Sequence, residues 1–450
     1  MTTNNNQLFV TKLGTIAVTV GSAVGLGNIW RFPFEAGTHG GGVFIFFYLL
    51  FTLLLGIPVI CSEFILGRST GCNVMKAYRC YTPKGFWFLS GYLGIIGSLM
   101  ILGFYSVVAG WTLYYLGESL TGGMEQTRDM LHTQFINFSS SDTLPVFSTL
   151  GFLLFNFIIV GIGVTKGIER VSNFLMPVLF ILLLVFCVNS LTMEKAGEGI
   201  RFLFSPDFSK VQPSTIIAAM GQAFFSLSIG IGTMTTYASY FQPTTNLGRT
   251  AVYTAGLDML VALLAGLIIF PAVFTFGFSP EAGPALVFEV LPAIFNDLPC
   301  GPLWSILFFF LLFIASLTST ISMSEIPIKF IVEQFGLKRI YATVITAVIA
   351  VTLGLACTLS FGVWSGFTIG GLNIFGLFDY VASNIILPVG GFIVSIYVGW
   401  KLDRSIVRSQ MTNDGKFKFP LLKLLIFCLR YIAPAGILLV FLNSIGITPN

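Results

Sequence analysis

The stretch GSAVGLGNIWRFP, residues 21–33, decides how the rest of the chain is read. It lies inside an apolar segment that begins near residue 13 and is long enough to span a bilayer. A continuous helix is disfavoured here, by about 1 kcal/mol for each interior glycine and about 3 kcal/mol for proline. Irregular backbone at membrane depth is tolerated only where protein buries it or where it lines a polar cavity. We therefore expect a helix break whose freed carbonyl and amide groups bind an ion and a solute.

The composition of the chain is that of a multi-pass membrane protein. Its 450 residues are 55% hydrophobic with a mean hydropathy of +0.90, and 9% are charged, whereas soluble proteins have about 25%. The net charge of +4 gives no indication of a nucleic-acid partner, and none is expected. The seven cysteines include no CxxC pair, so we interpret them as small apolar core residues.

Eleven apolar stretches are long enough to cross a membrane, and turn residues or charge clusters separate them. The predicted fold class is therefore an all-α integral membrane protein with eleven transmembrane helices. Their approximate bounds are 13–37, 42–67, 87–120, 145–163, 168–191, 214–241, 247–277, 303–333, 340–360, 375–400 and 420–445.

Lysine and arginine are distributed unevenly between the two sides of these spans. With the N-terminus inside, 17 of the 23 Lys and Arg residues fall on the cytoplasmic side and four fall outside, as the positive-inside rule requires. An odd number of spans then places the C-terminus outside. We expect a multi-pass protein of the cell inner (plasma) membrane, with the lipid bilayer as its surroundings.

The proline-rich segment 279–302 lies between the seventh and eighth spans and is too short and too broken to cross the membrane. We interpret it as a helical hairpin that caps the extracellular face, with a surface loop as the alternative. Helical spacing of its apolar residues favours docking. These residues are Leu286, Val287, Val290, Leu291 and Ile294.

The sixth span contains a second interruption, GQAFFSLSIGIG at residues 221–232. Two interrupted spans five apart predict inverted repeats with a binding site between the breaks. We assign repeat one to about residues 13–191 and repeat two to about 214–400. An extra helix at about 420–445 completes a single transmembrane domain, residues 1–450.

Polar side chains within the spans are candidates for function because burying them in a bilayer costs energy. Thr318 and Ser319 offer hard oxygen ligands suited to Na⁺, although close helix packing explains these small residues equally well. Asp258 is a lone carboxylate in an apolar helix and requires a cation, a proton or an arginine. Asp379 is also partly buried, with Arg31 as its candidate partner. Other acidic residues are expected to cap broken-helix ends or bond unwound backbone: Glu35, Glu63 and Glu325.

The residues around the breaks suggest an apolar pocket for a neutral solute. Tyr105, Phe225 and Ile231 are its first candidates, with ordinary core packing as the alternative. The sequence contains no GxxxxGK[ST] phosphate loop and no HExxH or Ser/His/Asp arrangement. Neither an ATP-driven pump nor an enzyme is indicated.

Several motifs resemble those of the neurotransmitter:sodium symporter family, and in particular its bacterial amino-acid transporter branch with the LeuT-like fold. They occur in family order along nearly the whole chain, and GLGN-x-WRFP is highly specific. The motifs are GLGNIWRFP (25–33), GVTKGIER (163–170), SPDF (205–208), GQAFFSLSIGIG (221–232) and SLTSTIS (316–322). This family is itself a standard example of inverted-repeat architecture. The resemblance implies sodium-coupled uptake of a small-molecule amino acid by alternating access.

The resemblance also implies two Na⁺ sites and a substrate site. The first Na⁺ site would use the Ala23 carbonyl, Asn28, Ser226 and Asp258. The second would use the carbonyls of Gly21, Val24 and Ala315 with Thr318 and Ser319. The substrate would contact Ala23, Leu26, Gly27, Ile101, Tyr105, Phe225, Ser226, Ser228, Ile231 and Met323.

Gates are implied on both sides of that substrate site. A lid would be formed by Tyr105 and Phe225. The outer gate would pair Arg31 with Asp379, and Glu333 would be the acid of the inner gate. The usual inner-gate arginine position is occupied by Asn6 and the usual tryptophan position by Phe9, with Lys12 as a substitute cation.

Two further features bear on mechanism. Asp258 stands where the family often has asparagine, and Ala262 aligns with a serine of a chloride-dependent member. A carboxylate at the first Na⁺ site can supply the negative charge that chloride provides elsewhere, so we expect chloride-independent transport. Gly167 and Pro177 flank a segment that is expected to unwind and admit water to the second Na⁺ site, a simple kink being the alternative.

The sequence therefore predicts a sodium-coupled symporter of a hydrophobic L-amino acid. A transporter-like, sodium-dependent sensor of an amino acid or amine, which binds without transport, is the alternative. A broken-helix transporter of another small amine or osmolyte also stays open.

Overall fold

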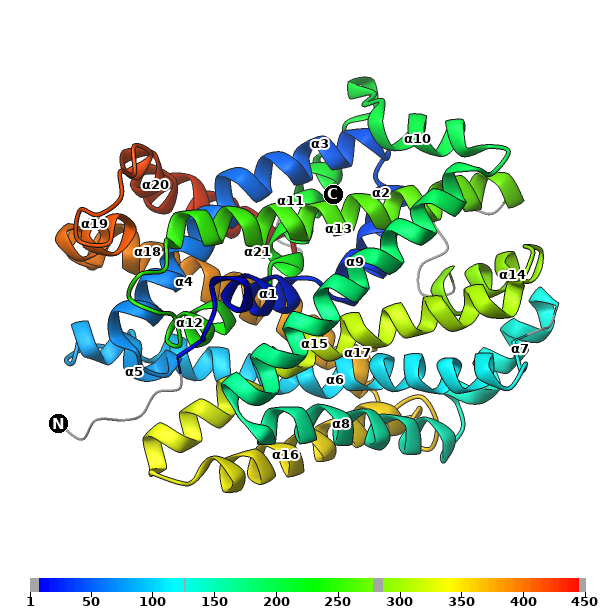
Figure 1. Ribbon diagram of the computed structural model, residues 1–450, viewed down its shortest axis with the longest axis horizontal. Helices are drawn as coiled ribbons and strands as arrows, with labels where there is room; N and C mark the ends of the chain where they lie inside the picture. The colour runs from blue at the N-terminus through cyan, green and yellow to red at the C-terminus, as the bar shows by residue number, and fades with distance from the viewer. Residues whose placement is uncertain (1–7, 125–126, 278–285, 445–450) are drawn as a thin grey trace.

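The computed structural model describes residues 8–124, 127–277 and 286–444, which fold into helices joined by short connections (Figure 1). The membrane-spanning region consists of α1 (Lys12–Ala23), α2 (Phe32–Thr38), α3 (Gly42–Phe51), α4 (Ile57–Thr70), α6 (Leu89–Leu120), α8 (Leu144–Ile162), α9 (Arg170–Leu191), α11 (Pro213–Ser226), α12 (Thr233–Ala238), α13 (Leu247–Phe276), α15 (Gly301–Phe335), α16 (Arg339–Leu359), α17 (Ile374–Tyr380), α18 (Leu387–Ile396), α20 (Leu422–Phe427) and α21 (Ala433–Ser444).

Shorter elements lie between and within these helices. The connecting helices are α5 (Val74–Tyr81), α7 (Arg128–Ser139), α10 (Ala196–Phe204), the 3₁₀ turn η4 (Phe208–Lys210), α14 (Leu291–Asn296) and α19 (Arg404–Thr412). The π-helical turns are η1 (Gly27–Arg31), η2 (Thr52–Gly56), η3 (Val164–Glu169), η5 (Leu286–Val290), η6 (Val381–Ile386), η7 (Tyr397–Lys401) and η8 (Cys428–Ile432).

The predicted spans are confirmed within a few residues at each end. In the described part of the chain, nine continuous helices are long and apolar enough to cross a membrane, and a pair bent by 52° at the first break makes ten. The remaining predicted span corresponds to α11 and α12, which are separate helices on either side of the second interruption. Counting them as one interrupted span gives the predicted eleven.

The connecting helices separate into two groups at opposite ends of the molecule (Figure 1). α5 and α19 lie at the end that holds the described N-terminal residues, and α7, α10 and α14 lie at the other end. The segments that the sequence analysis assigned to opposite sides of the membrane thus lie at opposite ends, and which end faces the cytoplasm stays a prediction. We call the α5 end the inner end and the α7 end the outer end.

The predicted cap between the seventh and eighth spans is partly described. Residues 278–285 lie outside the described residues, whereas η5 and α14 pack against α7 and α15. Val287, Val290, Leu291 and Ile294 are buried in that contact, as the helical spacing predicted.

The interpretation of the cysteines as apolar core residues is wrong for three of the seven. Cys72 is half-buried, and Cys80 and Cys300 are exposed, because these three lie at helix ends rather than within apolar spans. The others are buried as expected: Cys61, Cys187, Cys357 and Cys428.

Candidate functional site

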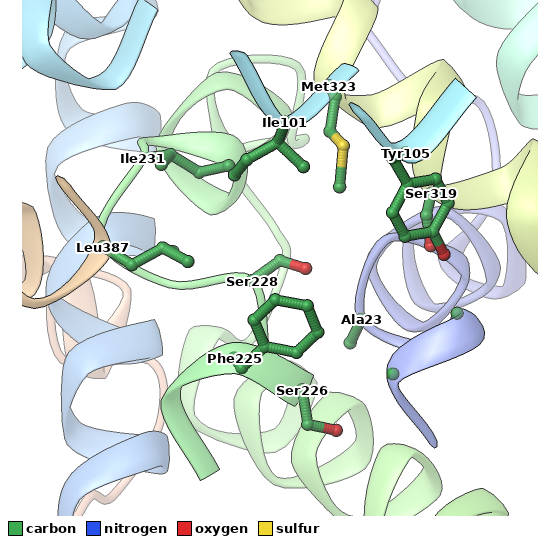
Figure 2. A pocket seen from close by; sticks show the side chains of 12 residues that line it. Ala23, Ile101, Tyr105, Phe225, Ser226, Ser228, Ile231, Ser319, Met323 and Leu387 are labelled. Atoms are coloured by element: carbon green, nitrogen blue, oxygen red, sulfur yellow. The ribbon is translucent and has the colours of Figure 1, made fainter. Parts of the chain in front are cut away.

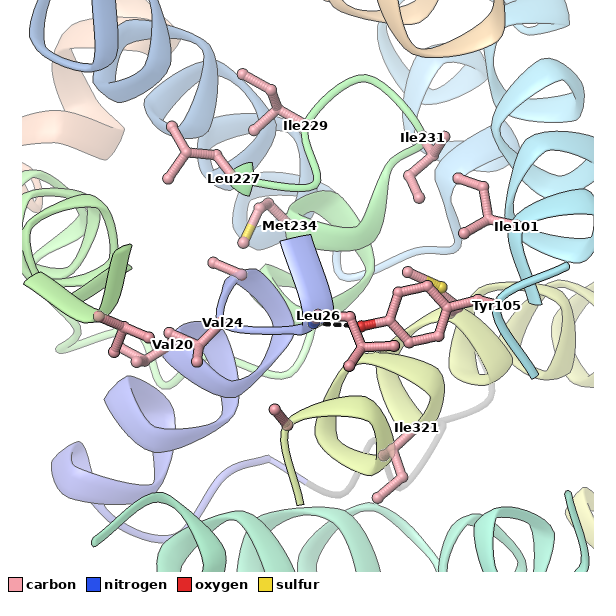
Figure 3. Close-up of a cluster of buried hydrophobic side chains, with 14 of the residues drawn as sticks. Val20, Val24, Leu26, Ile101, Tyr105, Leu227, Ile229, Ile231, Met234 and Ile321 are labelled. Carbon is pink, nitrogen blue, oxygen red and sulfur yellow. Dashed lines mark hydrogen bonds between the residues drawn. The ribbon is translucent and has the colours of Figure 1, made fainter. Parts of the chain in front are cut away.

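The first helix breaks where the glycine pattern predicted. α1 ends at Ala23, and the helix resumes at Leu26 and continues into η1 and α2 after two residues, Val24 and Gly25, that are not helical. Two amide groups freed by the break find side-chain partners. The Gly25 amide donates to Asn28 Oδ1 at 3.0 Å, and the Leu26 amide donates to the Tyr105 hydroxyl oxygen at 2.8 Å (Figure 3).

The second break, between α11 and α12, requires left-handed backbone. Ser228, Gly230 and Gly232 have φ values of 51°, 98° and 79°, a region that favours glycine. The Glu63 carboxylate accepts hydrogen bonds from the amides of Gly230 at 2.7 Å and Thr235 at 3.1 Å. Glu63 therefore bonds the unwound backbone, as predicted.

The two breaks contact each other. The Ser228 hydroxyl donates to the Ser22 carbonyl at 3.2 Å, and the Gln222 amide group donates to the Gly27 carbonyl at 3.2 Å. Segments nearly 200 residues apart in sequence are thus joined where both helices are interrupted.

Asp258 lies at the centre of a buried polar cluster beside the first break. Its two carboxylate oxygens accept hydrogen bonds from Asn28 Nδ2 and the Ser226 hydroxyl, both at 2.7 Å, and a longer one of 3.4 Å from the Tyr48 hydroxyl. Asp258 and Asn28 are fully buried. An ionised carboxylate at such a depth is stable only if hydrogen bonds and a cation offset its lost hydration. The structure therefore brings together the three side chains expected at the first Na⁺ site.

Oxygen atoms of α1 and α15 gather at a second point. The Ser319 hydroxyl donates to the Val24 carbonyl at 3.2 Å, and the Thr318 hydroxyl lies 3.1 Å from the Ala315 carbonyl oxygen. The helices touch here, since a Cβ atom on Gly21 would lie only 3.3 Å from Thr318 Cβ. These groups fit a small hard cation, and none of them carries a charge.

A transition-metal centre finds no support in the described residues. No group of three or more His, Cys, Asp or Glu side chains gathers there. The first cluster offers carboxylate, amide and hydroxyl oxygens, and the second offers carbonyl and hydroxyl oxygens.

A cavity of about 20 Å³ lies between the breaks (Figure 2). It is lined by Ala23, Gly25, Gly27, Ile101, Tyr105, Phe225, Ser226, Ser228, Ile231, Ser319, Met323 and Leu387. Nine of the ten predicted substrate residues are among them, and Leu26 contributes its amide to Tyr105 instead. A volume of this size holds about one water molecule, so a larger solute requires side chains to move. We call this space the central cavity.

A larger hollow of about 530 Å³, here called the vestibule, lies on the outer side of the central cavity. Phe225 and Tyr105 line both spaces and so separate them, where the predicted lid would be. Arg31 and Asp379 both line the vestibule. The Arg31 guanidinium lies 4.3 Å from the centre of the Phe225 ring and 3.6 Å from the Glu35 carboxylate.

The predicted pair of Arg31 with Asp379 is not formed: both residues border the vestibule, but each bonds another side chain. Asp379 accepts a hydrogen bond from the Ser383 hydroxyl at 2.8 Å, and Arg31 pairs with Glu35. Glu35 was expected to cap a helix end. Instead it lies one turn from Arg31, and it also contacts His39 at 3.3 Å.

The inner end holds two buried ion pairs. Glu325 was also expected to act as a cap, but it is fully buried and pairs with Arg339 at 2.6 Å. The Tyr240 hydroxyl donates to the same carboxylate at 2.7 Å. Arg339 can contact the Glu325 carboxylate because it is the first residue of α16, which begins shortly after α15 ends at Phe335.

Glu333 forms the second pair, with Lys329 one turn earlier on α15 at 3.5 Å. Its carboxylate also accepts hydrogen bonds from the Asn73 amide and side chain at 2.7 and 2.8 Å. Lys12, the substitute cation suggested by the sequence, is exposed at the start of α1, and Asn6 lies outside the described residues. The cation beside Glu333 in the structure is therefore Lys329 of the same helix, and not a residue of the N-terminal segment.

Some residues of the site were missed at the level of sequence: Tyr48, Asn73, Gln222, Lys329 and Leu387. Lys329 carried a usable signal, since a lysine within an apolar span is costly unless it is paired. It was counted instead among the cytoplasmic charges. The aromatic run around Tyr48 gave no indication that one hydroxyl reaches Asp258.

Two interrupted helices, an enclosed cavity between their breaks and oxygen clusters beside it define a membrane transporter of the broken-helix class. The chain belongs to the sodium:neurotransmitter symporter family, whose model matches residues 6–135 and 128–449. The members of this family are transporters, and the chain is not an enzyme.

Known proteins resemble the chain over its whole length. The uncharacterized sodium-dependent transporter YhdH of Bacillus subtilis is 39% identical over 440 residues, which cover 98% of each chain. An uncharacterized sodium-dependent transporter of Haemophilus influenzae is 34% identical over 99% of this chain and 100% of its own length. The crystal structure of MhsT in complex with L-phenylalanine has a TM-score of 0.90 and 41% identity, covering 97% of this chain and 99% of that one.

Proposed function

We propose that the protein is a sodium-coupled symporter of a hydrophobic L-amino acid that works by alternating access. The observation that carries the proposal is the buried cluster of Asn28, Ser226 and Asp258 beside the central cavity. A cation in this cluster and a zwitterionic solute in the cavity would neutralise each other's charges at a depth where unpaired charge is costly. Binding of the two would therefore be coupled.

The central cavity has a polar end and an apolar end. The solute carboxylate would meet Na⁺, the Tyr105 hydroxyl and the amides near Leu26 and Gly27. The solute amine would meet carbonyls near Ala23, Phe225 and Ser228.

The apolar end of the central cavity determines which class of amino-acid side chain the solute can have. Ile101, Ile231, Met323 and Leu387 line it, and Figure 2 shows Ile101, Ile231 and Met323 around the same space. Flexible methionine accommodates ligands of different shape. A large aliphatic or aromatic side chain fits this lining, and MhsT, the similar structure, holds L-phenylalanine.

Two Na⁺ ions are proposed, and their sites differ in charge. The first contains Asp258, and the second contains only carbonyl and hydroxyl groups around Thr318 and Ser319. One relative is named as dependent on chloride as well as sodium: the rat sodium- and chloride-dependent GABA transporter 2, which is 27% identical over 98% of this chain. In the present chain the Asp258 carboxylate would supply the negative charge, so replacing chloride with gluconate should leave uptake unchanged. A collapse of uptake in gluconate would contradict this role.

Alternating access would use the two ends of the molecule in turn. Movement of Phe225 and Tyr105 would open the central cavity to the vestibule, and separation of Glu333 from Asn73 and of Glu325 from Tyr240 would open it to the other side. The sidedness follows the sequence prediction, with the N-terminus in the cytoplasm and the C-terminus outside.

A scintillation-proximity competition panel of the twenty amino acids, with and without Na⁺, tests the proposal. We expect large hydrophobic L-amino acids to compete best and binding to disappear when Na⁺ is replaced by K⁺. Best competition by small or charged amino acids would contradict the substrate class. Sodium-dependent binding without sodium-driven uptake in proteoliposomes would indicate the sensor instead.

A further inference from the structure

Two cysteines lie side by side at the inner end. Cys72 lies in the turn between α4 and α5, and Cys80 lies in the last turn of α5. Their Sγ atoms are 4.0 Å apart, and Cys80 is exposed while Cys72 is half-buried. A disulfide needs an S–S distance of about 2.05 Å. Rotation of the side chains toward each other can close a gap of this size.

The turn that holds Cys72 also holds the inner ion pair. The next residue, Asn73, donates two hydrogen bonds to the Glu333 carboxylate. The Lys76 ammonium on α5 donates to the Glu333 carbonyl oxygen. The segment between the two cysteines is thus attached to α15 through Glu333.

We propose that Cys72 and Cys80 form a reversible disulfide modification site at the inner end of the transporter. The oxidant is a small disulfide of the glutathione class, which can reach Cys80 because that side chain is exposed. Neither thiol has a place in the cation or substrate sites, so the reaction leaves those sites intact.

The reaction proceeds in two exchanges. The Cys80 thiolate attacks one sulfur of oxidised glutathione, forming a mixed disulfide and releasing one glutathione thiolate. The Cys72 thiolate then attacks the Cys80 sulfur and displaces the second glutathione thiolate. The protein loses two protons and two electrons, and the oxidant is reduced to two thiols.

The surroundings of Cys72 determine which step is slow. Its thiol donates a weak hydrogen bond to the Thr70 carbonyl at 3.3 Å, and burial raises the pKa of the Cys72 thiol to about 12. Little thiolate is present at neutral pH. Closure of the mixed disulfide should therefore accelerate as pH rises.

The functional consequence rests on the proposed transport cycle. Opening of the inner end requires Glu333 on α15 to separate from Asn73. A disulfide that restrains the turn around Asn73 should slow this separation and hence uptake, and reduction by dithiothreitol should restore the original rate.

Trypsin mapping tests the site without reference to transport. Cleavage after Arg68, Lys76, Arg79 and Lys84 places Cys72 in the peptide STGCNVMK and Cys80 in the peptide CYTPK. Full-length protein in proteoliposomes, treated with oxidised glutathione, should yield these peptides as one species lighter by two hydrogens. Only glutathionylated CYTPK, or unmodified peptides, would overturn the proposal.

Variants separate the disulfide from its effect. Cys80→Ser should keep uptake before oxidation and lose both the linked peptide and the sensitivity to oxidised glutathione. Cys300→Ser, which removes an exposed thiol at the outer end, should behave as the unchanged protein. A second variant, Cys72→Ala, covers the case in which Cys80→Ser does not fold.

A linked peptide with unchanged uptake would overturn the functional consequence, whereas absence of sodium-driven uptake before oxidation would count against the proposed function.

Discussion

The two ends of the molecule are closed by different kinds of contact. At the outer end, Arg31 and Glu35 are 33% and 15% exposed and border a hollow of about 530 Å³. At the inner end, Glu325 and Arg339 are 0% and 25% exposed and lie 2.6 Å apart, and Lys329 and Glu333 are 3% and 8% exposed. A partly exposed ion pair contributes about 0–1 kcal/mol. Removing one partner of a buried pair costs about 3–5 kcal/mol.

This difference defines the state of the transporter in the structure. The inner end is closed by charges from α15 and α16 that are bonded to Tyr240 beyond α12 and to Asn73 between α4 and α5. Among the described residues, the lid of Tyr105 and Phe225 separates the central cavity from the vestibule at the outer end. In the proposed alternating-access cycle, opening inward would break buried polar contacts, whereas opening outward would mainly move Phe225 and Arg31, which lies over its ring.

The largest effect is expected from Glu325→Gln. The Arg339 guanidinium would keep its contact with the Val160 carbonyl but lose a charged partner in a buried site. A cost of about 3–5 kcal/mol corresponds to a shift of about 100-fold or more toward inward-open protein. Initial rates of sodium-driven uptake should fall accordingly, and hydrogen exchange around Tyr240 should accelerate. Glu194→Gln, at an exposed carboxylate, is the control, and equal effects of the two changes would contradict the comparison.

Lys329→Met should have a smaller effect in the same direction. Methionine fills a similar volume, and Glu333 keeps both hydrogen bonds from Asn73. We expect a loss of roughly 1–3 kcal/mol, seen as an uptake rate lower by about 5-fold to about 150-fold. Adding Glu333→Gln should recover part of the loss because the unpaired carboxylate is then neutral. Additive losses in the double variant would show that the two side chains act independently.

Pro177→Ala should slow the release of Na⁺ toward the inner end. Met176 Sδ, beside this proline, lies 3.4 Å from where a Gly21 Cβ would be, so this part of α9 packs beside the oxygen atoms proposed as the second Na⁺ site. Alanine favours the helix by up to about 3 kcal/mol over proline, which makes unwinding harder. We expect a decrease of up to about 10-fold in ²²Na⁺ efflux from loaded proteoliposomes. Unchanged efflux would count against this segment as the hinge.

Arg31→Gln should have the smallest effect of the four. Its exposed pair with Glu35 and its contact with Phe225 together contribute about 1 kcal/mol, or about 5-fold in sodium-dependent binding of the amino acid. Equilibrium binding measured by scintillation proximity gives this value directly, with Glu35→Gln as the matched change. A decrease in amino-acid binding of more than about 100-fold would show that the outer end, and not the inner end, has the stronger contacts.

The breaks and the oxygen clusters could be predicted from sequence because their signals are local. Glycines inside an apolar run cannot maintain a helix, and Asp258, Thr318 and Ser319 are polar residues where the bilayer tolerates few. The partners that Glu333 and Glu325 find on other segments, Asn73 and Tyr240, could not be predicted in this way. They depend on how α4, α12 and α16 converge on α15, and pairs such as Asn73 with Glu333 are 260 residues apart.

The same reasoning explains the two cysteines at the inner end. The separation of Cys72 and Cys80 in sequence fits no metal or redox motif, so composition alone favoured burial. Only the turn between α4 and α5 places their sulfur atoms at 4.0 Å.

The central claim is that Na⁺ in the Asp258 cluster and an amino acid in the central cavity move together across the membrane. Its most direct test is uptake of a radiolabelled hydrophobic L-amino acid into proteoliposomes under an inward Na⁺ gradient, for the unchanged protein and for Asp258→Ala. The account predicts accumulation that requires the gradient and is lost in the variant. Accumulation that is equal with K⁺ in place of Na⁺, or unaffected by Asp258→Ala, would contradict it.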